Sequence, residues 1–289
     1  MEFGPLLVLA LALASIVGLS LGLFGGGGSI LMVPLLSYVA GLPAKEAIAT
    51  SLLVVGATSA TSLIPHARKA NVRWKQGMVF AATSMLGAFG GGLLASGIPA
   101  QLLMLGFAII MLASARGMIR GRKNTGSATQ SLWLSAPVGL GIGMVTGLVG
   151  AGGGFLLVPA LALLAGLSMQ QAVGTSLLVI TLNSITGLAG QLNSVALDWP
   201  LAAGLATTAI LGSLIGARLS RRIDERALRK GFGYFVLAMG VFVLSQELPA
   251  PGGLVVVAVA ALAGALVLLC NKIPAMGARC PLVLKGETR

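Results

Sequence analysis

Two clusters of glycine residues have the composition and position to bind an anion. One cluster, Gly25–Gly28, stands directly before Ser29, and the other, Gly150 with Gly152–Gly154, stands directly before Phe155. Runs of glycine disfavour a continuous helix, so a helix that resumes after them begins with free backbone N–H groups and the positive end of its dipole. An anion can accept hydrogen bonds from such groups. The residues that we expect to shape this binding site are Gly25, Gly27, Gly28, Ser29, Gly150, Gly152, Gly153 and Gly154.

A second set of polar residues follows each glycine cluster on the next predicted helix. Spacings of seven, four and four residues place on one helical face Ser51, Thr58, Ser62 and His66. The corresponding face of the later helix carries Ser176, Asn183, Gly187 and Gln191. The side chains that we predict to bond the anion are Ser51, Thr58, Ser176 and Asn183. Asn183 is the best single candidate, because membrane hydroxyls often bond the carbonyls of their own helix or a neighbouring helix instead.

Other kinds of chemistry lack the residues that they need. His66 is the only histidine, so a zinc or iron site has too few imidazole ligands. The seven acidic residues stand near segment ends or in tails, which argues against a carboxylate proton relay inside a membrane. No Ser-His-Asp set, Cys-His pair or P-loop lysine accompanies the motifs. The sequence therefore predicts no enzyme, no cofactor and no metal site.

The composition predicts an all-α polytopic membrane protein. Of its 289 residues, 56% are hydrophobic and only 9% are charged, which is more apolar surface than a soluble fold could bury. Apolar runs that suit bilayer-spanning helices fall near 5–23, 47–66, 77–96, 101–119, 131–149, 171–190, 200–219, 230–247 and 252–270. Two shorter apolar runs, 28–40 and 153–166, follow the glycine clusters. The net charge of +12 comes from residues beside helix ends, so we expect contact with the lipid bilayer and no binding of nucleic acid.

The chain contains one unit twice. The segment GLFGGGGSILMVPLL at Gly22 returns as GLVGAGGGFLLVPAL at Gly147, and Pro34 returns as Pro159 with the same offset of 125 positions. One cluster alone would favour glycines that merely let helices pack closely. Two clusters, each joined to a proline by the same spacing, favour a functional break, and we expect the prolines to kink or stiffen the resumed helix. Repeated, interrupted membrane segments indicate a transporter binding site.

The basic loops predict the topology. Lys and Arg gather near 68–75, 116–123, 218–230 and 272–289, whereas the loops at 97–100, 191–197 and 248–253 are neutral. If each glycine-broken segment is re-entrant and turns back at its glycines, all four basic regions lie in the cytoplasm, as the positive-inside rule favours. The N-terminus is then outside and the C-terminus cytoplasmic. Basic and neutral loops exchange places between the two copies, which predicts two inverted repeats with about eight to nine membrane segments.

The 125-residue offset and the predicted topology divide the chain into four parts. Residues 1–123 form the first transmembrane repeat, 124–130 a cytoplasmic linker, and 131–247 the second transmembrane repeat. Residues 248–289 add a C-terminal membrane helix and a cytoplasmic tail. Cys270 and Cys280 fall at the end of that helix and in that tail, where a reducing compartment argues against a structural disulfide.

The duplicated motif resembles that of the TauE/SafE family of membrane permeases, which includes sulfite exporters. The pattern G-x-x-G-x-G-G-x-x-x-x-V-P stands here as GLFGGGGSILMVP and GLVGAGGGFLLVP, and A-x-x-T-S-L follows in each copy. The resemblance covers residues from about 5 to 270. It implies transport of sulfur-containing anions such as sulfite, sulfoacetate or other organosulfonates, often outward across a bacterial inner membrane.

The residues and the resemblance together favour one function and leave two others open. A site of helix N-termini, hydroxyls and an amide, without an acidic residue, suits a small oxyanion. We therefore predict an alternating-access carrier of small sulfur-containing anions. A passive anion channel would use the same glycine-lined constriction, and a membrane scaffold would need no polar face at all. The sequence leaves open the direction of transport, the coupling ion and whether the protein is a homo-oligomer.

Cysteine labelling tests the predicted topology. The variants Gly4→Cys and Ser194→Cys should react with an impermeant thiol reagent from outside the cell, because both positions precede inward-running segments. The variant Asn124→Cys should react only after permeabilisation. Labelling of Gly4→Cys from the inside alone would contradict the inverted arrangement.

Overall fold

Helices make up nearly all of the described structure. The computed structural model describes residues 4–26, 28–95, 100–120, 132–149, 154–191, 197–220 and 222–247, and it holds no strand within them. Its elements are α1 (Gly4–Phe24), α2 (Ser29–Pro34), η1 (Leu35–Val39), α3 (Ala44–Ala67), α4 (Trp74–Ala95), α5 (Ala100–Arg120), α6 (Leu132–Val149), α7 (Gly154–Pro159), η2 (Ala160–Leu164), α8 (Met169–Gln191), α9 (Trp199–Ser220) and α10 (Glu225–Glu247). The predicted linker at 124–130 and the predicted helix and tail at 248–289 lie outside the described residues.

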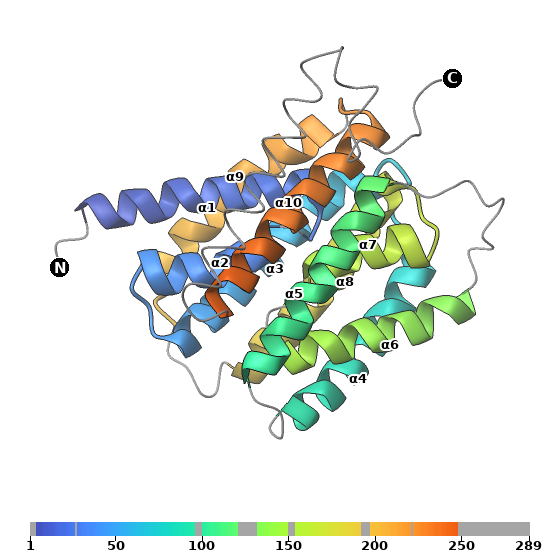
Figure 1. Ribbon diagram of the computed structural model, residues 1–289. Helices are drawn as coiled ribbons and strands as arrows, with labels where there is room; N and C mark the ends of the chain where they lie inside the picture. The colour runs from blue at the N-terminus through green and yellow to red at the C-terminus, as the bar shows by residue number, and fades with distance from the viewer. Residues whose placement is uncertain are drawn as a thin grey trace, which may run out of the picture.

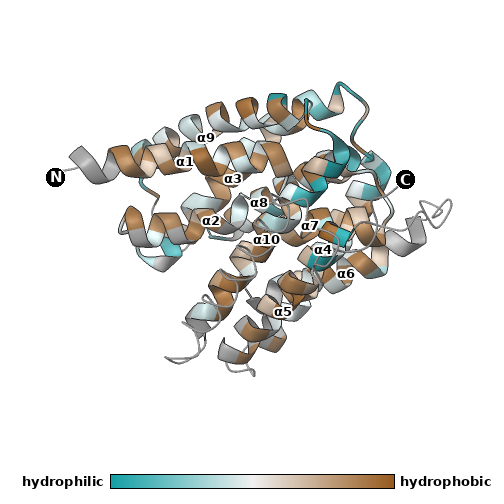
Figure 2. Cartoon of the chain, turned by 45° about the horizontal axis from the view of Figure 1, so that its top comes forward, coloured by the Kyte–Doolittle hydropathy of each residue, from teal (hydrophilic) through white to brown (hydrophobic). Residues whose placement is uncertain are grey.

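The helices have the length and the apolar exterior that a membrane requires. Within the described residues, those long and apolar enough to cross a bilayer are Lys45–Ala67, Met169–Ala189, Trp199–Ser220 and Glu225–Ser245. Large apolar side chains point outward, with Leu86 68% exposed and Phe89 73% exposed. Apolar residues run along the helices (Figure 2). Such an exterior suits lipid rather than water, so the predicted all-α membrane fold is confirmed.

Helices α1 and α9 pack closely because glycine lies between them (Figure 1). Gly18 lies against the backbone of Ala209, and Gly22 lies against the backbone of Ser213. The residue numbers of these contacts increase together along α1 and α9, so the two helices run in the same direction. Lipid tails are as apolar as leucine, so membrane helices associate through close packing at small residues rather than through a hydrophobic driving force.

Helices α4 and α6 repeat this packing. Gly143 lies against the backbone of Ser84, and Gly139 lies against that of Phe80, so these helices also run in the same direction. Gly143 stands 125 positions after Gly18, and Ser84 stands 125 positions before Ala209. One interhelical contact is therefore made twice, each time between a helix of one copy and a helix of the other.

Helices α3 and α8 lie antiparallel and carry the two predicted polar faces. A Cβ placed on Gly56 of α3 would come within 3.0 Å of Ser184 Cβ on α8, and Gly187 of α8 packs against Leu52 of α3. Residue numbers therefore increase along α3 where those of the contacting residues on α8 decrease. The two polar faces are thereby brought to one helix pair.

Helices α5 and α10 form a second antiparallel pair. Gly233 of α10 lies beside Met118 of α5, whereas Gly240, two turns later, lies beside Met111. Like α3 and α8, these helices occupy corresponding places in the two copies of the repeat.

The glycine-broken segments end in matching π-helical turns. After Pro34, which has no N–H to donate, the Ala40 N–H bonds the Leu35 carbonyl at 3.1 Å, a step of five residues. After Pro159, the Ala165 N–H bonds the Ala160 carbonyl at 3.0 Å. In both copies the helix therefore changes from α to π directly after the proline.

Two glycines on α4 test how far packing depends on small residues. A Cβ at Gly87 would overlap the backbone of α6, whereas a Cβ at Gly90 would meet no atom within 4 Å. We expect Gly87→Ala to lower the free energy of unfolding by about 1–3 kcal/mol, as overpacking does. Gly90→Ala should leave it unchanged or raise it by up to about 1 kcal/mol, because alanine favours the helix.

Chemical unfolding in detergent micelles would measure both variants. An equal loss of stability in Gly87→Ala and Gly90→Ala would contradict the close α4–α6 contact.

Candidate functional site

The two broken segments meet in the interior of the protein. Gly26, which precedes α2, lies directly against the carbonyl of Gly154, the first residue of α7. A Cβ on Gly154 would in turn come within 2.6 Å of Ser29 Oγ. Both glycines are buried. Because neither position has room for a side chain, we call this contact the central crossing, and it holds polar backbone from both copies of the repeat.

Helix α8 supports the central crossing from one side. Gly25 has a φ of +79°, which favours glycine, and its missing Cβ would lie 2.7 Å from Ser176 Oγ. Ser176 is fully buried and donates to the Val173 carbonyl at 2.8 Å. The turn that ends α1 is therefore seated on the polar face of α8.

Some backbone N–H groups at the start of α2 already have partners. The Ser29 N–H donates to the Gly26 carbonyl at 3.3 Å, and the Leu31 N–H donates to the Gly28 carbonyl at 3.2 Å. Both bonds are long, and no side chain caps the helix. Gly28 itself packs against the Val17 carbonyl of α1 rather than into the central crossing. Four of the predicted residues, Gly27, Gly150, Gly152 and Gly153, lie outside the described residues.

The predicted hydroxyl groups donate to backbone carbonyls in this conformation. Ser29 Oγ bonds Gly26 O at 2.7 Å, Ser51 Oγ bonds Ile48 O at 2.7 Å, and Thr58 Oγ1 bonds Val54 O at 2.6 Å. These are the bonds that hydroxyls commonly make within helices. To donate to an anion, each hydroxyl would first have to rotate away from its carbonyl, so their role in binding stays a prediction.

Asn183 lies apart from the central crossing, in a cavity of about 480 Å³. Five helices, α3, α4, α6, α7 and α8, contribute to this Asn183 cavity. Asn183 Nδ2 donates to Ser84 Oγ of α4 at 3.4 Å, which is a long bond, and Asn183 Oδ1 is buried without a hydrogen-bond partner. Ser84 carries no repeated signal in the sequence, because the residue 125 positions later is Ala209.

Ile180 contacts both the Asn183 cavity and the central crossing. Ile180 lines the cavity, and its Cδ1 lies 3.1 Å from the position that a Cβ on Gly154 would take. Leu157 of α7 lines the same cavity. The two groups of predicted residues, one around Gly154 and one around Asn183, are therefore neighbours across Ile180.

Several buried polar atoms near the α3–α8 pair have no partner. Ser59 and Ser62 are fully buried on α3, and their hydroxyl oxygens make no hydrogen bond, like Asn183 Oδ1 on α8. Buried polar groups in proteins are nearly always paired, so exceptions need an explanation. Asn183 Oδ1 belongs to a residue that lines the Asn183 cavity, where water or a polar ligand would give it a hydrogen bond.

The fold and the site together define the class of protein. Apolar helices surround an interior crossing of irregular backbone, which is tolerated at membrane depth only when buried in protein or lining a cavity. The protein is an integral membrane protein of the all-α class. Residues 10–243 match the family described as sulfite exporter TauE/SafE, and the chain belongs to that family.

Named relatives agree with this assignment. A probable membrane transporter protein of Xylella fastidiosa (strain 9a5c) is 35% identical over 248 residues, which cover 82% of this chain and 95% of that protein. The probable membrane transporter protein MJ0441 of Methanocaldococcus jannaschii is 31% identical over 260 residues, covering 84% and 97%. No solved structure matches the chain significantly. The protein is therefore a membrane transporter rather than an enzyme.

The contact between Gly25 and Ser176 can be tested by stability measurements with Gly41 as a control. Gly41 also has a positive φ, +70°, but a Cβ there would meet no atom within 4 Å. Gly41→Ala should therefore cost only the backbone term, about 1–2 kcal/mol. Gly25→Ala should cost more, because its Cβ would also press on Ser176 Oγ.

Removing that hydroxyl should restore part of the loss. In a double-mutant cycle of Gly25→Ala with Ser176→Ala, measured by chemical unfolding, we expect a favourable coupling of about 1 kcal/mol. Additive effects would show that the Gly25 turn is not seated on α8.

Proposed function

We propose that the protein is an alternating-access carrier of small sulfur-containing anions such as sulfite, sulfoacetate or other organosulfonates. The observation that carries the proposal is the central crossing, where Gly26 and Gly154 bring the starts of two broken helices together. Backbone N–H groups and hydroxyls lie there, and no acidic residue stands within either broken segment. Such a site favours an anion, whose oxygens can accept several hydrogen bonds.

The proposed binding set combines backbone and side-chain donors from both copies. The residues of the glycine turns are Gly25, Gly27, Gly28, Ser29, Gly150, Gly152, Gly153 and Gly154, and the side chains are Ser51, Thr58, Ser176 and Asn183. Pro34 and Pro159 act as hinges in this proposal. The π-helical turns that follow them support it, because such turns are frequent at functional sites.

Two inverted repeats account for the helix packing. A two-fold axis in the membrane plane would make corresponding helices antiparallel, as α3 lies to α8 and α5 to α10. It would also exchange the α1–α9 pair with the α4–α6 pair, and both pairs are parallel and glycine-packed. With the basic loops in the cytoplasm of a bacterial cell, the N-terminus would lie outside the inner membrane and the C-terminus inside.

In this orientation the Asn183 cavity is the outer access to the site. Asn183 lies in the half of α8 that leads to the neutral loop at 191–197. Nearer the opposite end, Gly174 of α8 packs against the Asn71 carbonyl, and Thr175 Oγ1 accepts a bond from the Arg73 N–H at 3.1 Å. These contacts support a conformation that is reached from outside and closed toward the cytoplasm, with Ile180 as the last barrier before the central crossing.

Asn183 would act as a donor that changes partners. Its Nδ2 makes only a long bond of 3.4 Å to Ser84 Oγ, so an arriving anion oxygen could take that N–H at small cost. Ser84 Oγ keeps its own bond to the Ala81 carbonyl at 2.9 Å. The amide would thus hold the anion in the cavity before it passes Ile180.

Two other functions are separated from the carrier by flux measurements. A passive channel would show flux without saturation and without counterflow. A membrane scaffold would keep its function when Asn183→Ala and Ser176→Ala are combined. Saturable uptake with counterflow would favour the carrier over both.

Sulfite uptake into liposomes that contain the purified protein tests the proposed function. Asn183→Ala should weaken apparent sulfite affinity about fivefold, the value of one neutral hydrogen bond. Asn183→Asp keeps the shape of the side chain but places a negative charge in the cavity, so it should reduce sulfite flux at least about tenfold by repulsion.

Thr207→Ala is the matched control. Thr207 is an exposed hydroxyl on α9 that bonds the Gly204 carbonyl, far along the chain from the cavity residues. Its loss should leave flux unchanged. If sulfite, sulfoacetate and thiosulfate all fail to cross in protein shown to be folded, the proposed substrate class is wrong.

A further inference from the structure

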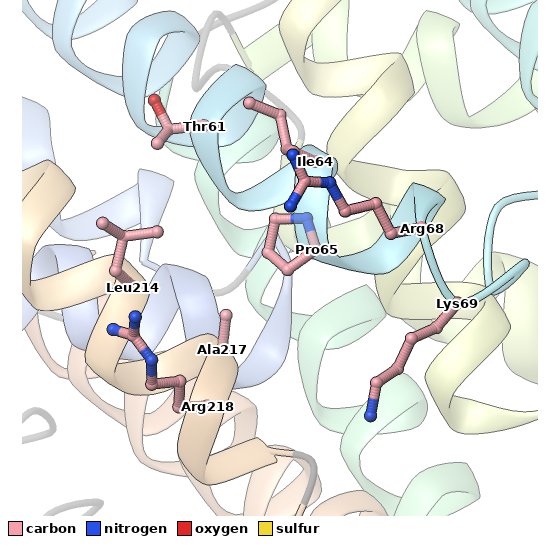
Figure 3. Close-up of a pocket in the computed structure, with 8 residues that line it drawn as sticks. All are labelled: Thr61, Ile64, Pro65, Arg68, Lys69, Leu214, Ala217 and Arg218. Carbon is pink, nitrogen blue, oxygen red and sulfur yellow. The ribbon is translucent and has the colours of Figure 1, made fainter.

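A second cavity lies between the last turns of α3 and α9 (Figure 3). Its volume is about 450 Å³, and we call it the α3–α9 pocket. Helix α3 contributes Thr61, Ile64 and Pro65, and α9 contributes Leu214 and Ala217. It shares none of these residues with the Asn183 cavity, so it forms a separate site.

The mouth of the α3–α9 pocket is strongly basic. Arg68, Lys69 and Arg218 line it, all three are exposed, and no acidic residue is among the lining residues. Figure 3 shows the Arg68 side chain extending from the end of α3 toward the pocket and the Arg218 side chain lying along α9 beside Leu214, whereas Lys69 points away from both. Two positive charges that share one cavity repel each other, and a bound anion would relieve that repulsion.

The floor of the pocket is apolar and continues into the surface that faces lipid. Ile64 is 50% exposed, and Leu211 and Ile215 on the neighbouring face of α9 are 62% and 56% exposed. The hydroxyl of Thr61 donates to the Ala57 carbonyl at 2.7 Å, so it adds no ready donor to the apolar floor of the pocket. A ligand that fits must therefore combine an anionic group with an apolar chain.

The basic mouth has no counterpart at the positions that the 125-residue repeat relates to it. The positions that correspond to Arg68 and Arg218 hold Asn193 and Leu93, although Thr61 corresponds to Thr186. A charge needed at the central crossing would be expected in both copies. The two arginines therefore point to a role at one membrane face only. The positive-inside rule places that face in the cytoplasm.

We propose that the α3–α9 pocket binds an anionic phospholipid of the cytoplasmic leaflet. The phosphate lies between Arg68 and Arg218, and an acyl chain lies over Ile64 and Leu214. Arginine binds phosphate oxygens well, and basic pockets between membrane helices on the cytoplasmic side suit anionic headgroups. Bound there, the lipid links α3, which carries one polar face, to α9, which packs against α1. The site does not depend on which anion the protein carries.

Native mass spectrometry of the full-length protein in detergent tests this site. Phosphatidylglycerol and phosphatidylcholine with the same chains are titrated separately, and phosphatidylglycerol should bind more tightly. Each basic charge near the surface contributes about fivefold in affinity, so R68Q with R218Q should weaken phosphatidylglycerol binding about thirtyfold. The matched control is R116Q with R120Q, which removes two exposed charges from α5 outside the pocket and should leave the affinity unchanged.

Two further measurements distinguish the lipid from a free anion. Glycerophosphoglycerol and sulfite, which lack acyl chains, should not displace phosphatidylglycerol, and Leu214→Asn should weaken the lipid while both arginines remain. Unfolding of each variant without lipid should match that of the unaltered protein. Equal weakening by the α5 control, or displacement by the free anions, would overturn the proposal.

Discussion

The structure depends on how the protein satisfies irregular backbone inside a membrane. A bilayer offers no water to the N–H and C=O groups that a broken helix leaves unpaired. In this protein the described ends of the two broken segments meet, so that Gly26 contacts the carbonyl of Gly154 in the buried interior. Such an approach requires glycine on both sides, and it explains why the clusters occur as a pair.

Small residues extend the same principle from the centre to the periphery. Gly18 against Ala209 and Gly143 against Ser84 bring whole helices into backbone contact. Because neither helix of such a pair belongs to the same copy as its partner, the two halves of the chain interlock instead of packing side by side. The broken segments are thus held by helices of both halves, and any movement of one half against the other would act on the central crossing.

Charge is separated in space. The described interior offers amides, hydroxyls and helix termini, whereas the described arginines stand near helix ends. Arg68 and Arg218 come together only because α3 lies beside α9. On this view the neutral interior serves the cargo, and the basic surface serves the membrane.

The sequence by itself determined the membrane class, the duplication and most helix boundaries, because apolar length, glycine breaks and the 125-residue register are local or repeating properties. It did not determine with which group each polar side chain forms its hydrogen bond. The hydroxyls of Ser51 and Thr58 lie on the predicted face, yet they bond their own helix, and Asn183 bonds Ser84, 99 residues away. Likewise, no spacing along the chain relates Arg68 to Arg218. Only the tertiary structure decided these contacts, because they depend on which helices the close approach of glycines allows to meet.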